Sequence, residues 1–432
     1  MEFSDYNRTM AVIKRNFLRE LKEHLNKKEI SLIIGPRQSG KTFLMRLLKE
    51  YLDKKGEITL FLGLDFEADK KVFASQNASV KKIELEIGKV KGYVFIDEIQ
   101  RKEDAGVFLK GIYDMNLPYK FIVSGSGSVE LKEKIHESLA GRKRVFELNT
   151  ISFDEFVNFR TNYRYNKKLA DFVRLEEGKT SEFLKEYLNF GGYPRVILEE
   201  KLSEKIKIID DIFHSYLEKD ISYLLKVKNT EVFSSLVKVL ASQIGNLTNY
   251  SELASTLGIS FQTVRNYLWY LEKTFVIEKL TPYFRNIRKE ISRAPVVYFY
   301  DLGLRNYASG VFGNVSELTE NGFLFQNFIF NILKEKIRFT GASLHFWRTK
   351  EKAEVDFVVD SGKDILPIEV KYKRFRQPEI GRSLRNFIEK YSPKRALIIN
   401  LSMSEQVKIA QTEIVFLPYW EFLLENYKIS NP

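Results

Sequence analysis

The stretch that decides the fold is Ile30-Ser31-Leu32-Ile33-Ile34-Gly35-Pro36-Arg37-Gln38-Ser39-Gly40-Lys41-Thr42. A short apolar run leads directly into the pattern G-x-x-x-x-G-K-T, and residues 43–48 then carry apolar side chains at helical spacing. Strand, glycine-rich loop and helix in this order predict a phosphate-binding P-loop.

Each residue type in this loop has a chemical reason. The two glycines allow backbone conformations that side chains would forbid, so several N–H groups can converge on phosphate oxygens. The next helix adds its positive end, the lysine should reach the β- and γ-phosphates, and the threonine hydroxyl should bind Mg²⁺. We therefore predict ATP and Mg²⁺ as cofactors. The predicted nucleotide contacts are Gly35, Pro36, Arg37, Gln38, Ser39, Gly40, Lys41 and Thr42, of which Lys41 is also catalytic.

Two further strands should complete the site. Residues 93–98 form an apolar run that ends in Asp97 and Glu98, as expected of a central parallel strand with acids at its carboxyl end. Asp97 would hold the metal ion through water and Glu98 would act as general base; a solvated turn is the alternative. Residues 120–126 form the other strand, and Ser124, favoured over Ser126, would contact the γ-phosphate or the attacking water.

An arginine finger is predicted at Arg142, directly after a helix-ending glycine, in preference to Arg144. Such a residue stabilises the charge of the transferred phosphoryl group. An arginine that only caps the helix carbonyls is the alternative. Because fingers often act between subunits, we expect a homo-oligomer.

Composition limits the class of protein. The 432 residues predict two to four domains, and 44% hydrophobic with 29% charged residues is typical of globular protein. There is no run of about 20 apolar residues to cross a bilayer, residues 1–10 lack the apolar core expected of a signal peptide, and there is no cysteine. We expect a cytoplasmic protein without membrane contact. The net charge of +12 suits either solubility or a polyanionic partner.

The motifs together resemble a known family. The P-loop, Phe-Ile-Asp-Glu-Ile-Gln at 95–100, Ser-Gly-Ser-Gly-Ser at 124–128 and Glu-Ser-Leu-Ala-Gly-Arg at 137–142 look like those of AAA+-type ATPases of archaea and bacteria. Residues 190–194 and 216–221 are similar to a poorly characterised domain fused to one such group. The resemblance implies an α/β, AAA+-like ATPase domain over residues 1–150.

Residues 151–240 are predicted to form a helical lid, beginning with Ser152 as a possible cap and Glu155 as its partner. Residues 241–312 resemble a winged helix-turn-helix. Two helices, 249–257 and 261–273, are joined at a glycine, and two strands then flank a basic loop over 284–293. The basic loop would contact DNA phosphates. Protein contacts or subunit packing are the alternative.

Residues 313–432 resemble the restriction-endonuclease-like fold of the archaeal Holliday-junction resolvases. Asp356 on one strand and Glu369 with Lys371 on the next would bind Mg²⁺ and orient a water, and all three would be catalytic. One departure matters: Gln326 stands where related domains carry a glutamate, and an amide is a poorer Mg²⁺ ligand than a carboxylate. A live nuclease, a silent DNA-binding fold and a purely structural fold all remain open.

The sequence thus predicts a Mg²⁺-ATP-dependent ATPase that acts on DNA, expected to be branched or broken, with a possible nuclease site. The alternative is a signalling or defence ATPase in which nucleotide controls oligomerisation and the carboxyl-terminal domains bind a protein. A nuclease gated by nucleotide is a third possibility.

Overall fold

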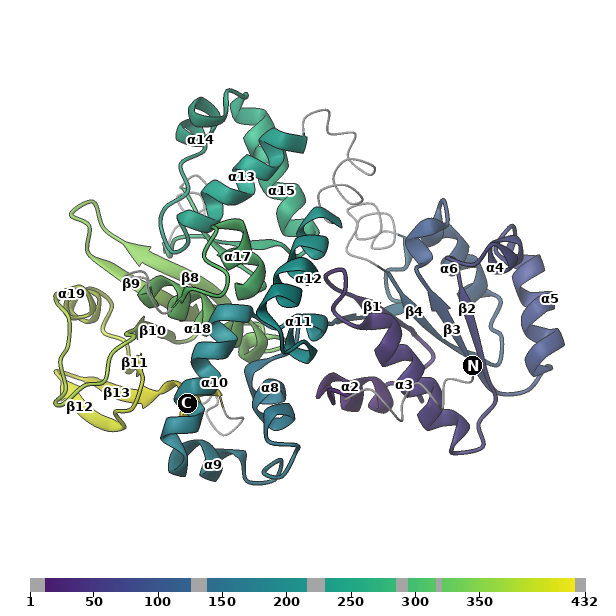
Figure 1. The fold of residues 1–432 in the computed structure, drawn as a ribbon, viewed down its shortest axis with the longest axis horizontal. Helices are drawn as coiled ribbons and strands as arrows, with labels where there is room; N and C mark the ends of the chain where they lie inside the picture. The colour runs from purple at the N-terminus through teal and green to yellow at the C-terminus, as the bar shows by residue number, and fades with distance from the viewer. Residues whose placement is uncertain (1–11, 126–137, 216–229, 285–293, 316–320, 424–432) are drawn as a thin grey trace. The chain divides into compact units, whose positions relative to one another are not determined.

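The computed structural model describes residues 12–125, 138–215, 230–284, 294–315 and 321–423 (Figure 1). The chain forms two compact units, each built from several segments. Unit 1 comprises residues 1–155, 192–230 and 269–276, and unit 2 comprises residues 156–191, 231–268 and 277–432. The four consecutive domains expected from the sequence stay a prediction.

Unit 1 contains a five-stranded parallel sheet in the order β2-β3-β4-β1-β5. Its strands are β1 (Ile30–Ile34), β2 (Thr59–Gly63), β3 (Gly92–Asp97), β4 (Tyr119–Ser124) and β5 (Lys143–Glu147). Every residue of β1, β3 and β4 is buried, which explains their continuous apolar runs. The acidic strand and the P-loop strand are therefore separated by β4.

Unit 1 also contains several helices. They are α2 (Phe17–Glu23), α3 (Lys41–Asp53), α4 (Glu67–Val72), α5 (Gln76–Ile87), the short 3₁₀ helix η1 (Ile99–Arg101), α6 (Ala105–Asp114), α11 (Pro194–Leu198) and α12 (Leu202–Ser215). The core under α3 joins Leu44, Met45 and Leu48 to Phe95 and Phe146 of the sheet. Apolar residues at helical spacing thus pack α3, and the loop before it, onto the sheet.

The middle of the chain forms helices and a two-stranded sheet. They are α8 (Phe153–Arg160), α9 (Leu169–Leu175), α10 (Glu177–Phe190), α13 (Thr230–Ser242), α14 (Tyr250–Leu257), α15 (Phe261–Lys273), β6 (Ile277–Leu280), β7 (Val296–Phe299) and α17 (Leu302–Ala308). Gly258 ends α14 in the left-handed conformation, at the glycine that the sequence predicts between the two helices, and Val264, Leu268 and Leu271 of α15 are buried. The expected basic loop lies largely outside the described residues.

Unit 2 also contains a six-stranded mixed sheet in the order β12-β13-β11-β10-β9-β8. Its elements are α18 (Asn321–Ile337), β8 (Ser343–Arg348), β9 (Glu354–Asp360), β10 (Ile365–Val370), α19 (Arg382–Tyr391), β11 (Arg395–Asn400), β12 (Glu405–Ile409), β13 (Thr412–Pro418) and α20 (Tyr419–Leu423). β8, β9 and β10 are antiparallel neighbours, whereas β10 and β11 are parallel. The predicted strands carrying Asp356 and Glu369 are therefore adjacent.

No helix among the described residues is both long enough and apolar enough to cross a membrane.

Candidate functional sites

The P-loop follows β1 and has a conformation that depends on its glycines. A Cβ on Gly35 would lie 2.1 Å from the carbonyl oxygen of Leu148, so only glycine fits there. Gly40 has φ +94° and precedes the first residue of α3, and Gln38 has φ +56°. The strand, loop and helix predicted from the sequence are all present.

Lys41 lies at the start of α3 and is 6% exposed. Its Nζ donates hydrogen bonds to the carbonyl oxygens of Gly35 at 3.0 Å and Pro36 at 2.7 Å. The ammonium group is thus held inside the loop whose N–H groups would bind phosphate. Thr42 is the next residue of the same helix.

The acidic strand and its neighbour converge beside the loop. The Ser124 hydroxyl donates a hydrogen bond to Asp97 Oδ1, and the backbone N–H of Glu98 donates to Ser124 Oγ at 3.2 Å. Asp97 is 7% exposed and Ser124 is fully buried. The two strand ends predicted to complete the site are therefore joined through the serine hydroxyl.

Glu98 has an unusual backbone and a perturbed carboxyl group. Its φ of 57° and ψ of 43° place it in the left-handed region, where a non-glycine residue is uncommon. Its carboxylate accepts a hydrogen bond from the Gln100 amide. Burial raises the pKa of Glu98, Lys41 acts against this rise and Asp97 adds to it. A carboxyl group with a raised pKa is a stronger base at neutral pH.

The oxygen atoms at this site fit Mg²⁺. Asp97 offers one carboxylate and Thr42 one hydroxyl, and Mg²⁺ in nucleotide sites is usually held by one or two protein oxygens together with phosphates. The described residues contain no cluster of three or more His, Asp or Glu side chains that could hold a metal alone. The donor set therefore suits an ion that arrives with the nucleotide.

Arg142 lies near the amino-terminal end of β1, whereas the P-loop lies at its carboxyl-terminal end. Ile30, the first residue of β1, donates its N–H to the Arg142 carbonyl, whereas the P-loop follows the last residue of β1. The Arg142 guanidinium pairs with Asp114, with its Nε 2.8 Å from Oδ1. Because β1 and β5 are parallel, Arg142 is one strand length from the P-loop of its own chain. A role as finger therefore stays a prediction for the nucleotide of a neighbouring subunit.

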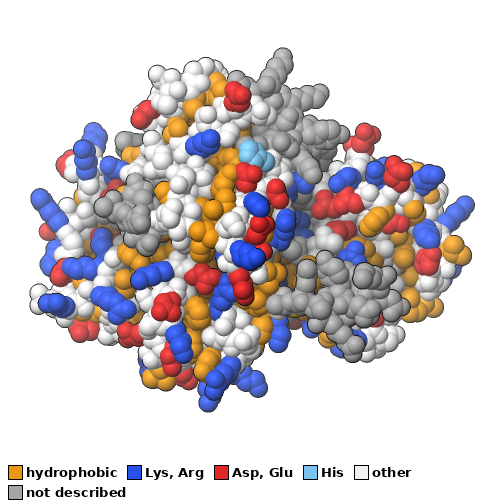
Figure 2. Space-filling view, in the orientation of Figure 1, with side chains coloured by type: hydrophobic (Ala, Val, Ile, Leu, Met, Phe, Trp, Pro, Cys, Tyr) orange, Lys and Arg blue, Asp and Glu red, His pale blue; other side chains and the backbone are white. Residues whose placement is uncertain are grey.

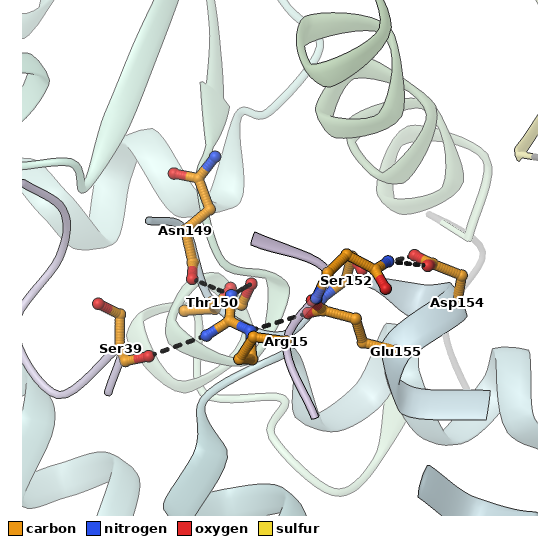
Figure 3. Close-up of polar contacts among 8 residues, drawn as sticks. Arg15, Ser39, Asn149, Thr150, Ser152, Asp154 and Glu155 are labelled. Atoms are coloured by element: carbon orange, nitrogen blue, oxygen red, sulfur yellow. Dashed lines mark hydrogen bonds and ion pairs between the residues drawn. The ribbon is translucent and has the colours of Figure 1, made fainter. Parts of the chain in front are cut away.

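Two arginines near the P-loop were missed by the sequence analysis. Arg195 Nη1 donates to Gln38 Oε1 at 3.2 Å. Arg15 Nη1 donates to the Ser39 carbonyl at 3.1 Å, and its Nε contacts Glu155 Oε2 at 3.0 Å (Figure 3). Arg195 directly follows the 190–194 motif, which was the available signal. No sequence signal pointed to Arg15, because most of its partners are backbone carbonyls.

The predicted capping pair at the start of α8 forms in part. Glu155 Oε2 accepts the N–H of Ser152 at 3.1 Å, which is one half of a capping box. The Ser152 hydroxyl instead donates to Asp154 Oδ1 at 2.5 Å. Glu155 is therefore directed toward the chain before the helix.

The second candidate site lies on β9, β10 and α18. The Gln326 amide donates to Asp356 Oδ1 at 2.8 Å, and the Val370 N–H donates to Asp356 Oδ2 at 2.7 Å. Burial raises the pKa of Asp356 to about 7, Lys371 lowers it and Glu369 raises it. Both oxygens of this carboxyl group thus accept hydrogen bonds from the protein.

Glu369 and Lys371 are paired with each other at this site. Lys371 Nζ lies 3.2 Å from Glu369 Oε2, and the Glu369 side chain is 4% exposed. Burial alone would lower the pKa of Lys371, but Glu369 and Asp356 outweigh it and raise that pKa. The structure brings the three predicted residues together with Gln326. The neutral amide takes one oxygen that a divalent ion would need, so the donor set fits Mg²⁺ poorly.

A third surface is the first half of α15. Gln262, Arg265 and Asn266 are exposed there, beside the buried Val264, and Gln262 Nε2 donates to Asn266 Oδ1 at 2.9 Å. Arginine, asparagine and glutamine are the side chains that most often contact base edges.

Family models agree with the amino-terminal site. Residues 27–157 match a model described as an AAA domain. This match covers the P-loop, Asp97, Glu98 and Ser124. Unit 1 carries a P-loop ATPase domain. Two other models, each described as a domain of unknown function, match residues 181–314 and 321–422.

Relatives of similar length occur in bacteria and archaea. A protein of Mycobacterium tuberculosis is 28% identical over 395 residues, which are 90% of this chain and 80% of the relative. A Haemophilus influenzae protein is 26% identical over 421 residues, covering 95% and 98%. A Methanocaldococcus jannaschii protein is 23% identical over 423 residues, covering 94% and 90%. All three are described as uncharacterised.

Solved structures resemble the chain only distantly. The Aeropyrum pernix ORC1 protein in complex with DNA has a TM-score of 0.28 and 10% identity, covering 68% of this chain and 91% of that one. The replication initiator DnaA bound to AMPPCP and single-stranded DNA has a TM-score of 0.29 and 15% identity, covering 61% and 90%. These scores are too low to carry an argument about this chain.

Proposed function

We propose that this protein is a Mg²⁺-ATP-dependent ATPase that acts on DNA, with branched or broken DNA as the expected form. The ATPase half is supported by the P-loop together with the Asp97, Ser124 and Glu98 contacts. The observation that carries the DNA half is the exposed polar face of α15.

Several residues of unit 1 have separate roles in the proposed ATP hydrolysis. Lys41 exchanges its two carbonyl partners for phosphate oxygens when nucleotide binds. Ser124 holds Asp97 and the backbone of Glu98, which directs the Glu98 carboxylate toward the attacking water as general base. Thr42 and Asp97 would hold Mg²⁺, which would neutralise part of the phosphate charge when bound.

The DNA contacts are proposed on unit 2. Arg265, Gln262 and Asn266 contact base edges or phosphates from α15. The exposed residues Lys373 and Arg374 add phosphate contacts. Their ion pairs with Glu379 and Glu177 are exposed, and such pairs contribute only about 0–1 kcal/mol, so phosphates can replace them.

The site at Asp356 is proposed to bind DNA without cutting it. The Gln326 amide and the Val370 N–H occupy both Asp356 oxygens, and Lys371 neutralises Glu369. Lys371 is 45% exposed, so its ammonium can still contact a phosphate. Figure 2 shows Lys and Arg interspersed with Asp and Glu over the face in view, which favours local contacts over one continuous basic surface.

The test is ATP turnover and DNA cleavage measured together on linear, forked and four-way DNA with Mg²⁺. We expect DNA to raise turnover, its affinity to fall steeply with salt, and no strand to be cut. Turnover indifferent to every DNA would contradict the DNA half and favour nucleotide-controlled binding of a protein partner. Cleavage that Asp356→Asn abolishes would instead show a nuclease.

A homo-oligomer is proposed as the working form. The support is the distance between Arg142 and its own P-loop, which leaves a neighbouring subunit as the place for a finger.

A further inference from the structure

Arg15 joins its own amino-terminal segment to the P-loop and to residues 149–155, which are both distant from it in sequence. Its Nη1 donates to the carbonyl oxygen of Ser39 in the P-loop at 3.1 Å. Its Nη2 donates to the carbonyls of Asn149 at 2.8 Å and Thr150 at 3.2 Å, just after β5. The Nε hydrogen bonds to Glu155 at the start of α8 (Figure 3). One planar guanidinium thus serves four acceptors, which a lysine could not do.

The ion pair between Arg15 and Glu155 is buried, and further hydrogen bonds fix both side chains. The side chains of Arg15 and Glu155 are 8% and 5% exposed. Glu155 also accepts the N–H of Asn16 at 2.6 Å on Oε1 and the N–H of Ser152 at 3.1 Å on Oε2. Three donors from two segments therefore hold the carboxylate, and the carboxylate in turn holds the guanidinium in one orientation.

The Ser39 carbonyl belongs to the same peptide unit as the Gly40 N–H. A trans peptide is planar, so its C=O and N–H point in opposite directions. A guanidinium that binds the Ser39 oxygen on one side therefore directs the Gly40 N–H to the other side, into the loop. Gly40 has φ +94° and no side chain, so its own backbone restrains this peptide less than that of another residue would.

We propose that Arg15 is a positioning residue of the nucleotide site, which aims the Gly40 N–H at a phosphate group. The inference rests on the proposed function, because it assumes that the P-loop binds a nucleoside phosphate. Arg15 does not contact the ligand. It acts on the phosphate-binding amide through the peptide, and its positive charge further polarises that amide.

The test compares Arg15→Lys with Asn16→Ala in the full-length protein. Arg15→Lys keeps a cation beside Glu155, so the buried carboxylate stays paired, but an ammonium cannot span all four acceptors. Asn16→Ala is the control, because it removes a hydrogen bond to Asp154 in the same network without touching the P-loop. Binding of ADP and of inorganic pyrophosphate is measured by calorimetry, beside the melting temperature and the KM and kcat of ATP turnover.

For Arg15→Lys we expect ADP and pyrophosphate to bind about 10-fold more weakly by a common factor, the effect of one charged hydrogen bond. The affinities of Asn16→Ala should stay within about twofold of wild type, and the melting temperatures should show that both variants remain folded at the assay temperature. Unchanged ADP affinity in Arg15→Lys would overturn the inference, even with ATP turnover intact. Wild-type protein that binds neither ligand would overturn the proposed function together with it.

Discussion

At the scale of single residues, Glu98 combines a left-handed backbone with a partly buried carboxylate and a raised pKa. Glu98→Gln keeps the shape and removes the base, so we expect turnover to fall by about 10²–10⁴ while ATP binding is retained. Steady-state turnover and binding of a fluorescent nucleotide check this. Ser124→Ala is the companion variant, because it removes the hydroxyl between Asp97 and Glu98. A hydrolysis rate unchanged in Glu98→Gln would remove Glu98 from the role of base.

Gln326 decides whether the Asp356 site can take a metal ion. Gln326→Glu removes the amide that donates to Asp356 Oδ1 and adds a third carboxylate to Asp356 and Glu369. We expect this variant to gain Mn²⁺ or Mg²⁺ binding that the wild type lacks, since these ions prefer carboxylate oxygens. Calorimetric titration with Mn²⁺ measures it.

The control for this gain is the double variant Gln326→Glu with Asp356→Asn, which should lose the ion again. Tight Mn²⁺ binding by the wild type at this site, abolished by Asp356→Asn, would contradict a silent site.

The positions of candidate site residues were predictable where the motifs themselves place them, and their roles stay predictions. Lys41, Asp97 and Glu98 follow from the order of strand, loop and acids, and Ser124 from a polar residue at a strand end. Arg15 was not predictable, because its role depends on carbonyl groups that every residue has. The hydrogen bond from Gln326 to Asp356 could not be foreseen either, since it depends on where α18 lies against β9.

At the scale of elements, α2 docks on the sheet of unit 1 through a buried titratable contact. His24 follows the last residue of α2 and is 3% exposed. Its Nδ1 lies 2.8 Å from Ser31 Oγ and 3.2 Å from Lys120 Nζ. Burial, followed by the charge of Lys120, lowers the pKa of His24 to about 4 from 6.5. The folded state therefore binds fewer protons than the unfolded state between these two values.

The contribution of His24 to the free energy of unfolding should consequently be fully present above pH 6.5 and be lost as the pH falls toward 4. The loss from this residue should be at most about 3 kcal/mol. Urea unfolding followed between pH 7 and pH 4.5 measures the loss. His24→Asn cannot titrate in this range, so its stability should vary less with pH than that of wild type. Equal acid sensitivity in both proteins would assign the loss to other groups.

Some helices and strands were predicted from the sequence, and others were not. The helices expected at 249–257 and 261–273 are present as α14 and α15, and the expected strands bearing Asp356 and Glu369 are present as β9 and β10. Residues 76–87, by contrast, form α5, a helix that was not predicted from the sequence. Buried Ser79, Ile83 and Ile87 recur at helical spacing, which is the signal that was missed.

At the scale of the whole molecule, the proposal requires DNA on unit 2 to change turnover in unit 1. Arg265→Ala should weaken DNA binding and its stimulation of turnover while basal turnover stays unchanged, and should reduce the salt slope by about one. Lys238→Ala on α13 is the matched control, since it removes one exposed positive charge from another helix. Equal losses of DNA binding and of DNA-stimulated turnover in both variants would show only a general effect of charge.

Assembly gives the second test at this scale. Arg142 lies one strand length from its own P-loop, so it can serve as finger only for a neighbouring subunit. Arg142→Ala and Glu98→Gln should therefore each lose turnover alone, the first because its neighbour's nucleotide lacks a finger and the second because it lacks the base. In a mixed oligomer, a Glu98→Gln subunit can supply Arg142 to the intact Glu98 site of an Arg142→Ala subunit. Turnover that reappears on mixing the two inactive proteins is the expected result, and mixtures that stay inactive while forming oligomers would exclude Arg142 as a finger acting between subunits.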